Sequence, residues 1–236
     1  MTERRERIQI MDAARGTAVV LMVIHHFLYD AVVFLGAPEW LFTNPVFDVL
    51  HFLFAGLFIF LSGVSSRFSR SNTVRGLKAL AAAMCITAVT AVMEMTVLFG
   101  VLHLLAFCMI FYGLTHAFWE RLPGALLPAL CAALTVLTAP LADGEPSSLT
   151  FLWMFGWTYP GFSSSDYFPI FPWIFVFLAG AWAGGPIRDR RLPDWFYAFR
   201  APLPAAIGRK ALWIYLLHQP VLYALTLGIK AVFPNR

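Results

Sequence analysis

Four ionisable side chains lie within the first long apolar stretch of the chain. Asp12 and Arg15 are three residues apart, Arg15 and His26 eleven, and His26 and Asp30 four. These intervals keep all four on one face of an α-helix, whereas His25 points to a different face. Eleven helical residues rise about 16 Å, so Arg15 and His26 would lie near opposite ends of a membrane-spanning segment. Ionisable residues at such depth are costly and indicate function by default.

Three further apolar stretches carry polar side chains near one end: Asp48 with His51, His103, and the group Tyr215, His218 and Gln219 just before Pro220. A neutral imidazole near a carboxylate accepts a proton close to neutral pH, so these histidines suit general-base chemistry on a hydroxyl or an amine. Structural roles stay open, because i, i+3 charge pairs neutralise each other and polar groups hold helices together. No HExxH or similar spacing occurs, and we expect no metal.

The composition identifies the environment that must position these residues. Apolar residues make up 60% of the 236 residues and charged residues 13%, against about 45–50% and about 25% in soluble domains. This excludes a soluble globular domain, a disordered chain and a disulfide-stapled secreted module. The net charge of +4 is better explained by orientation in a membrane than by nucleic acid, so we expect membrane lipids as partners and no nucleic acid.

The hydrophobic pattern predicts an all-α polytopic membrane protein with about seven transmembrane helices, in a single domain over residues 1–236. A spanning helix needs about 20 apolar residues. The candidates are residues 10–35, 47–66, 77–96, 98–119, 125–141, 168–186 and 211–233. The fifth is the weakest, because Pro128 and Pro140 lie within it.

The basic residues predict the orientation of these helices. Fifteen of the 17 Lys and Arg residues lie before the first candidate helix, at its start, or in the connections that follow the second, fourth and sixth. They are Arg4, Arg5, Arg7, Arg15, Arg67, Arg70, Arg75, Lys78, Arg121, Arg188, Arg190, Arg191, Arg200, Arg209 and Lys210. Only Lys230 and Arg236 fall on the opposite side. The positive-inside rule therefore predicts a cytoplasmic N-terminus and an external C-terminus.

Five segments between Arg7 and Pro220 resemble a bacterial branch of the heparan-α-glucosaminide N-acetyltransferase family of transmembrane acyltransferases. They are RIQIMDAARGTAVVLMVIHH, FIFLSGVSSRFSR, FGVLHLLAF, DYFPIFPW and GRKALWIYLLHQP. The spacing of Arg15 and His26 also resembles the R-x10-H signature of the wider membrane acyltransferase superfamily. The resemblance implies transfer of an acetyl group from cytosolic acetyl-CoA to a sugar amine or hydroxyl on the far side. It also implies that His26 matches the catalytic histidine and Arg15 its basic partner.

The leading hypothesis is therefore a transmembrane acyltransferase that uses acetyl-CoA, or another acyl-CoA, as co-substrate. His26 would act as general base, oriented by Asp30, His103 or His218. Arg15 and Asp12 would serve the donor end, and Tyr215 and Gln219 are the candidates to stabilise the oxyanion of the acyl donor.

Two alternatives stay open at this point. The same polar face could serve a proton-coupled transporter of a small polar molecule, or its residues could only hold helices together in a non-enzymatic subunit. Short loops favour a small or lipid-linked acceptor over a polymer. The resemblance also allows a homodimer.

Overall fold

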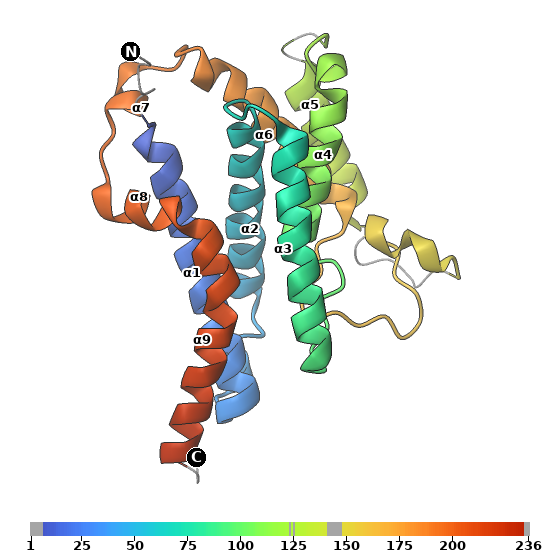
Figure 1. The fold of residues 1–236 in the computed structure, drawn as a ribbon, viewed down its shortest axis with the longest axis vertical. Coiled ribbons are helices and arrows are strands. Elements are labelled where there is room, and N and C mark those ends of the chain that lie inside the picture. The colour runs from blue at the N-terminus through green and yellow to red at the C-terminus, as the bar shows by residue number, and fades with distance from the viewer. Residues whose placement is uncertain (1–6, 123, 125, 141–147, 234–236) are drawn as a thin grey trace. The chain divides into compact units, whose positions relative to one another are not determined.

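The computed structural model describes residues 7–122, 124, 126–140 and 148–233, most of them in helices (Figure 1). The elements, with η marking short 3-10 helices, are α1 (Gln9–Leu35), η1 (Glu39–Leu41), α2 (Pro45–Ser66), α3 (Asn72–Val92), α4 (Val101–Trp119), α5 (Leu126–Thr138), η3 (Thr150–Phe155), α6 (Ile170–Arg188), α7 (Asp194–Ala198), α8 (Pro202–Arg209) and α9 (Ala211–Val232). These described ranges contain no strand, only one isolated bridge between Phe99 and Tyr167. The predicted all-α class is confirmed.

Six helical segments are long and apolar enough to cross a membrane: α1, η1 with α2 (Glu39–Ser66), α3, α4, α6 and α9. The predicted ranges agree with α1, α2, α4, α6 and α9 within three residues, whereas α3 starts five residues before position 77 and ends four residues before position 96. Ser71 explains the earlier start, because its hydroxyl accepts a hydrogen bond from the Val74 N–H and caps the helix. The chain is a multi-pass membrane protein.

The chain divides into two compact units, and the division falls within α2. Unit 1 consists of Met1–Phe58 and Leu192–Arg236, and unit 2 of Ile59–Arg191. A single functional domain over residues 1–236 stays a prediction.

In unit 1, α1 packs against α8 and α9. Gly16 of α1 and Gly208 of α8 bring the two backbones into contact, and a Cβ at either position would lie 2.9 Å from the amide nitrogen of the other. Further along, the ring of Phe34 meets that of Tyr223 at a centroid distance of 5.4 Å. The chain therefore runs in the same direction through α1 and α9. Because the two helices run in the same direction, the beginning of α1 and the end of α9 lie at opposite ends of the unit.

In unit 2, the packing shows which way each helix runs. The start of α4 and the segment before α6 lie together, because the Leu98 N–H donates to Ser164 (3.0 Å) and the Phe168 N–H to the Phe99 carbonyl (2.8 Å). At the other end, Arg67, just after α2, contacts both Glu120, just after α4, and Gly184, near the end of α6. Thus α4 and α6 are parallel, and the chain must return across the unit between them.

Helix α5 lies in that returning segment. Its 13 residues span about 20 Å, shorter than the hydrocarbon core of about 30 Å. The fifth predicted span, 125–141, is therefore a shorter apolar helix than expected, and its ends at 125 and 141 lie outside the described residues. The described residues therefore contain six candidate spans and one shorter apolar helix where about seven spans were predicted.

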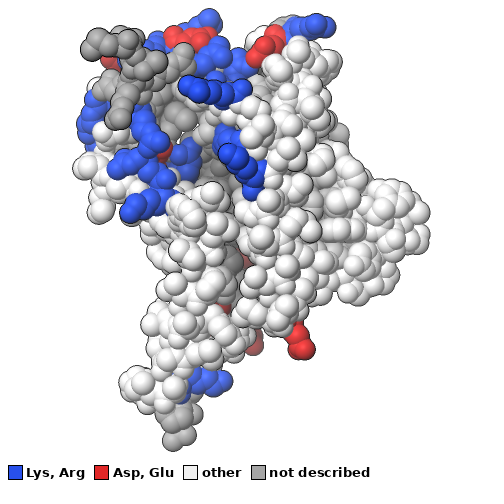
Figure 2. Space-filling view, in the orientation of Figure 1, with Lys and Arg blue, Asp and Glu red and all other residues white. Residues whose placement is uncertain are grey.

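Basic side chains gather at one end of the helices of each unit (blue in Figure 2). In unit 1 this is the end where α1 begins, and in unit 2 the end where α2 and α6 stop. Lys230 lies in the last turn of α9, at the opposite end of unit 1. This distribution agrees with the one used to predict orientation, although Arg4, Arg5 and Arg236 lie outside the described residues.

Candidate functional site

The contact between α1 and α9 in unit 1 brings together five of the predicted site residues. The rings of His26 and His218 lie with their centroids 4.8 Å apart, tilted by 58°. Tyr215 lies one turn before His218, and the two ring centroids are 5.8 Å apart. Asp30 and Gln219 form hydrogen bonds to each other one turn further along α1. Helices far apart in sequence thus build one polar cluster, here called the histidine site.

A hydrogen bond to the backbone fixes which nitrogen of His218 can accept a proton. Its Nδ1 lies 2.7 Å from the carbonyl oxygen of Tyr215. A carbonyl oxygen only accepts, so Nδ1 carries the hydrogen and, in the neutral ring, Nε2 carries the lone pair. That Nε2 is buried and has no hydrogen-bond partner among the described residues. His218 therefore presents a buried base whose tautomer is already set.

Asp30 is fully buried and contacts Gln219. The Gln219 side-chain amide donates to both carboxylate oxygens, at 3.0 Å and 3.3 Å. Both oxygens belong to one carboxylate, so a single N–H of the Gln219 amide points at them, and the Gln219 oxygen Oε1 is buried with no partner among the described residues. Gln219 thus offers a buried acceptor at the site, and the predicted role of Gln219 and Tyr215 in stabilising the oxyanion stays a prediction. Asp30 positions Gln219 in this arrangement, and its predicted role in orienting His26 stays a prediction.

Asp12 and Arg15 pair with each other near the start of α1. Arg15 Nη1 lies 3.0 Å from the Asp12 carboxylate, and both side chains are at least four-fifths buried. The pair neutralises itself in part, as the structural alternative anticipated. Its position, about three turns from His26, is the expected one. A role at the donor end stays a prediction.

His103 belongs to unit 2, where it has its own hydrogen-bond network. Its Nε2 lies 3.1 Å from the Thr87 hydroxyl, which itself donates to the Val97 carbonyl at 2.7 Å. Since the single hydroxyl hydrogen points to Val97, His103 Nε2–H is the donor to Thr87. The ring is buried and stacks on Phe99. Through these contacts, His103 helps to hold α4 against α3.

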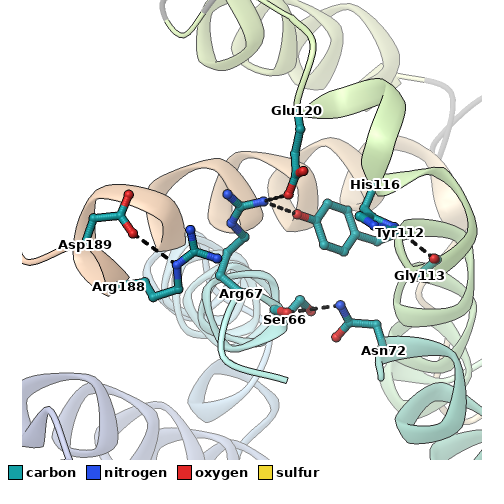
Figure 3. Close-up of polar contacts among 9 residues, drawn as sticks. All are labelled: Ser66, Arg67, Asn72, Tyr112, Gly113, His116, Glu120, Arg188 and Asp189. Carbon is teal, nitrogen blue, oxygen red and sulfur yellow. Dashed lines mark hydrogen bonds and ion pairs between the residues drawn. The ribbon is translucent and has the colours of Figure 1, made fainter. Parts of the chain in front are cut away.

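Sequence reasoning did not identify the cluster around Arg67 in unit 2 (Figure 3). Arg67 Nη1 donates to the Tyr112 hydroxyl at 3.0 Å and to Glu120, and its Nε is buried without a partner among the described residues. Burial opposes the charge, but the bonds to Tyr112 and Glu120 outweigh it and raise the guanidinium pKa above its ordinary value. The only signal in the sequence was a basic residue immediately after an apolar stretch.

Nearby residues of this end of unit 2 bond among themselves. Asn72 donates to the Ser66 carbonyl at 3.0 Å, and Arg188 Nε donates to Asp189 at 3.1 Å. The end of unit 2 that carries most of its Arg residues is therefore held by several local polar contacts, while Arg67 Nε and Asn72 Oδ1 are buried with no partner among the described residues.

Comparison with known families agrees with the resemblance of the five segments. A family model described as heparan-alpha-glucosaminide N-acetyltransferase, catalytic, matches residues 7–220. No curated protein matches the chain, and no solved structure does. The matched range contains every residue of the histidine site and the pair Asp12–Arg15. The chain therefore belongs to the heparan-alpha-glucosaminide N-acetyltransferase family, and it is a multi-pass membrane protein of the acetyltransferase type.

Proposed function

We propose that the protein transfers an acetyl or other acyl group from cytosolic acyl-CoA to an extracytoplasmic sugar or lipid-linked acceptor. The observation that carries the proposal is the buried Nε2 of His218, which lies beside the His26 ring and has no hydrogen-bond partner in the part of the chain that the structure describes. A lone pair kept away from water and from other donors is ready to accept a proton from a hydroxyl or an amine.

The chemistry follows from the two rings. An imidazole of the His26–His218 pair takes the proton of the acceptor, and the acceptor oxygen or nitrogen attacks the thioester carbonyl. The carbon–sulfur bond then breaks and the CoA thiolate takes up a proton. Two imidazoles this close cannot both be charged cheaply, so the pair holds one proton as a unit. This keeps the base role of His26 and adds His218 as its partner.

The donor would approach from the basic end of unit 1. That end carries Arg7, Arg15, Arg200, Arg209 and Lys210. Guanidinium and ammonium groups bind phosphate oxygens well, which suits the phosphates of CoA. The distance of about 16 Å along α1 from Arg15 to His26 would then be bridged by the acyl-bearing arm of the donor.

The acceptor class follows from the family, whose name specifies a glucosaminide amine. The chain would act on the amine or hydroxyl of a sugar at the external end of α1, in a bacterial plasma membrane with its N-terminus in the cytoplasm. The clustering of basic residues supports this orientation.

The test uses purified protein in detergent with acetyl-CoA and either D-glucosamine or glucose, and measures both thiol release and acetylated product. We expect His26→Gln and His218→Gln to lower kcat by about 10²–10⁴-fold, the usual contribution of a general base. His116→Gln is the matched control, because His116 is exposed at the end of α4 in unit 2.

Binding of the donor is tested separately by thermal stabilisation. Acetyl-CoA at 100 times its Kd stabilises a protein by about 2.7 kcal/mol. We expect this stabilisation in the wild type and in His26→Gln but not in Arg15→Ala, with Lys230→Ala, at the far end of α9, as the charge control. Folded protein that neither binds nor consumes any acyl-CoA, yet takes up a small solute into liposomes, would favour the transporter.

A further inference from the structure

Two more histidines extend the His26–His218 pair within unit 1. The rings of His25 on α1 and His51 on α2 stack with their centroids 4.5 Å apart and their planes 19° apart. The rings of His25 and His26 meet edge to face at 5.8 Å. The four imidazoles therefore form a continuous row, in the order His51, His25, His26 and His218, across α2, α1 and α9. Four of the six histidines of the chain stand in this row.

We propose that this row is a proton relay, which carries the proton of an amine acceptor from the His26–His218 pair through His25 to His51 and out to water. The proposal rests on the proposed function. It assigns a role to His25 and His51, two residues that acyl transfer by a single base does not need.

The proton balance explains why an amine acceptor needs a relay. A sugar amine enters largely as the ammonium ion, R–NH3+, and reacts with the thioester to give the amide, free CoA thiol and one proton. The nitrogen–carbon bond forms, the carbon–sulfur bond breaks, and one of the two protons lost by nitrogen goes to the thiolate. The other has no acceptor among the products and must leave the site. A hydroxyl acceptor releases only one proton, which the thiolate takes up.

The geometry of the row suits this task. Centroid distances of 4.5–5.8 Å are within the span of one bridging water between two ring nitrogens. Each imidazole can accept a proton at one nitrogen and release one from the other. At the His51 end, the exposed carboxylate of Asp48 lies one turn earlier on α2 and favours arrival of positive charge. At the other end, the Asp30 carboxylate is held by Gln219.

The rings of Phe42 and Phe54 also contact this row. Phe54 lies 5.7 Å from His25 and 5.4 Å from His51 by ring centroids, and Phe42 lies 4.8 Å from His25. Simple aromatic packing would use His25 and His51 in the same way as these phenylalanines. A decisive test must therefore keep the rings and remove only the nitrogens.

The test compares His25→Phe and His51→Phe with Phe54→Leu, which removes a neighbouring ring, and with His116→Phe, which removes an exposed histidine of unit 2. Acetyl transfer from acetyl-CoA is measured with D-glucosamine and with glucose. With the amine we expect kcat to fall by about tenfold or more in both relay variants at unchanged KM for acetyl-CoA, with partial recovery on adding imidazole. With the hydroxyl acceptor the loss is much smaller, and the two controls lose no amine selectivity.

Three results would overturn the relay while leaving the acyltransferase intact. These are relay variants as fast as the wild type with the amine, equal losses with amine and hydroxyl, and a loss that imidazole does not restore in folded protein. A wild type that transfers no acyl group to either acceptor would refute both proposals together. Imidazole nitrogen-15 spectra give a readout without an acceptor: in a connected row, His51→Phe shifts the titration of His26, and an unchanged titration contradicts the relay.

Discussion

The contact between Gly208 of α8 and Gly16 of α1 gives the sharpest stability prediction. A Cβ at Gly208 would overlap the carbonyl oxygen of Asp12 and come within 2.9 Å of the Gly16 amide nitrogen. Ordinary contacts of this kind begin near 3.4 Å, and the overlap with the carbonyl oxygen is the larger of the two, so α1 and α8 would have to separate by more than an ångström. Both neighbours are helix backbone and cannot rotate away, unlike the tip of a flexible side chain.

The Gly208→Ala substitution makes two contributions of opposite sign to the free energy of unfolding. Alanine favours an exposed helix over glycine by about 1 kcal/mol, whereas overpacking costs about 1–3 kcal/mol and more where rigid backbone is the obstacle. We expect the clash to dominate and to lower the free energy of unfolding by about 2 kcal/mol. For a chain of this size that is about 4–8 °C in Tm.

The assay is thermal unfolding in detergent, followed by the fluorescence of the eight tryptophans. Gly228→Ala is the matched control, because it lies in α9 and a Cβ there would meet nothing within 4 Å. The control should unfold at or slightly above the wild-type temperature. A Gly208→Ala protein that unfolds at that same temperature would refute the close approach of α1 and α8.

Three further predictions concern unit 2. Thr87→Val removes the acceptor of the His103 N–H and leaves that buried group unsatisfied, so unfolding should become easier by about 1–3 kcal/mol, measured as a lower Tm; an unchanged Tm would contradict the assigned bond. Arg67→Met should also lower Tm, because Glu120 loses its partner, and Glu120→Gln should lower it less; the reverse order would be inconsistent with Arg67 as the central group. Burial raises the pKa of Tyr167 to about 12. The stabilising effect of the Tyr167 side chain is therefore complete below pH about 10, its pKa in the unfolded chain, and is lost as the pH rises to about 12. The Tm difference between wild type and Tyr167→Phe should shrink over that range, and a constant difference would contradict the raised pKa.

The sequence predicts the helices well because each spanning segment is long and apolar. It fails at α5, where a run of apolar residues with two prolines forms a helix of only 13 residues. It also starts α3 too late, since a capping serine rather than hydropathy sets that end. Helix ends depend on single hydrogen bonds, which hydropathy does not record.

The site shows the limit of helical periodicity in the same way. Placing His26 and Asp30 on one face of α1 follows from their spacing of four residues. The choice of partners does not follow, because it depends on how α1 and α9 pack. Asp30 bonds to Gln219, and His218, 192 positions after His26 in the chain, supplies the neighbouring ring. Arg67 shows a second limit, since its burial comes from helices that lie elsewhere in the sequence.

The bond from His218 Nδ1 to the Tyr215 carbonyl has an evolutionary consequence. Its acceptor belongs to the peptide backbone, so the tautomer of His218 does not depend on which side chain stands at position 215. Mutation of Tyr215 to phenylalanine or leucine would preserve it, whereas a single inserted or deleted residue between the two positions would destroy it. The base of this site is therefore encoded by a spacing within one helical turn. A segment this short can be transplanted into another helix, where the same backbone hydrogen bond would again leave Nε2 as the proton-accepting nitrogen.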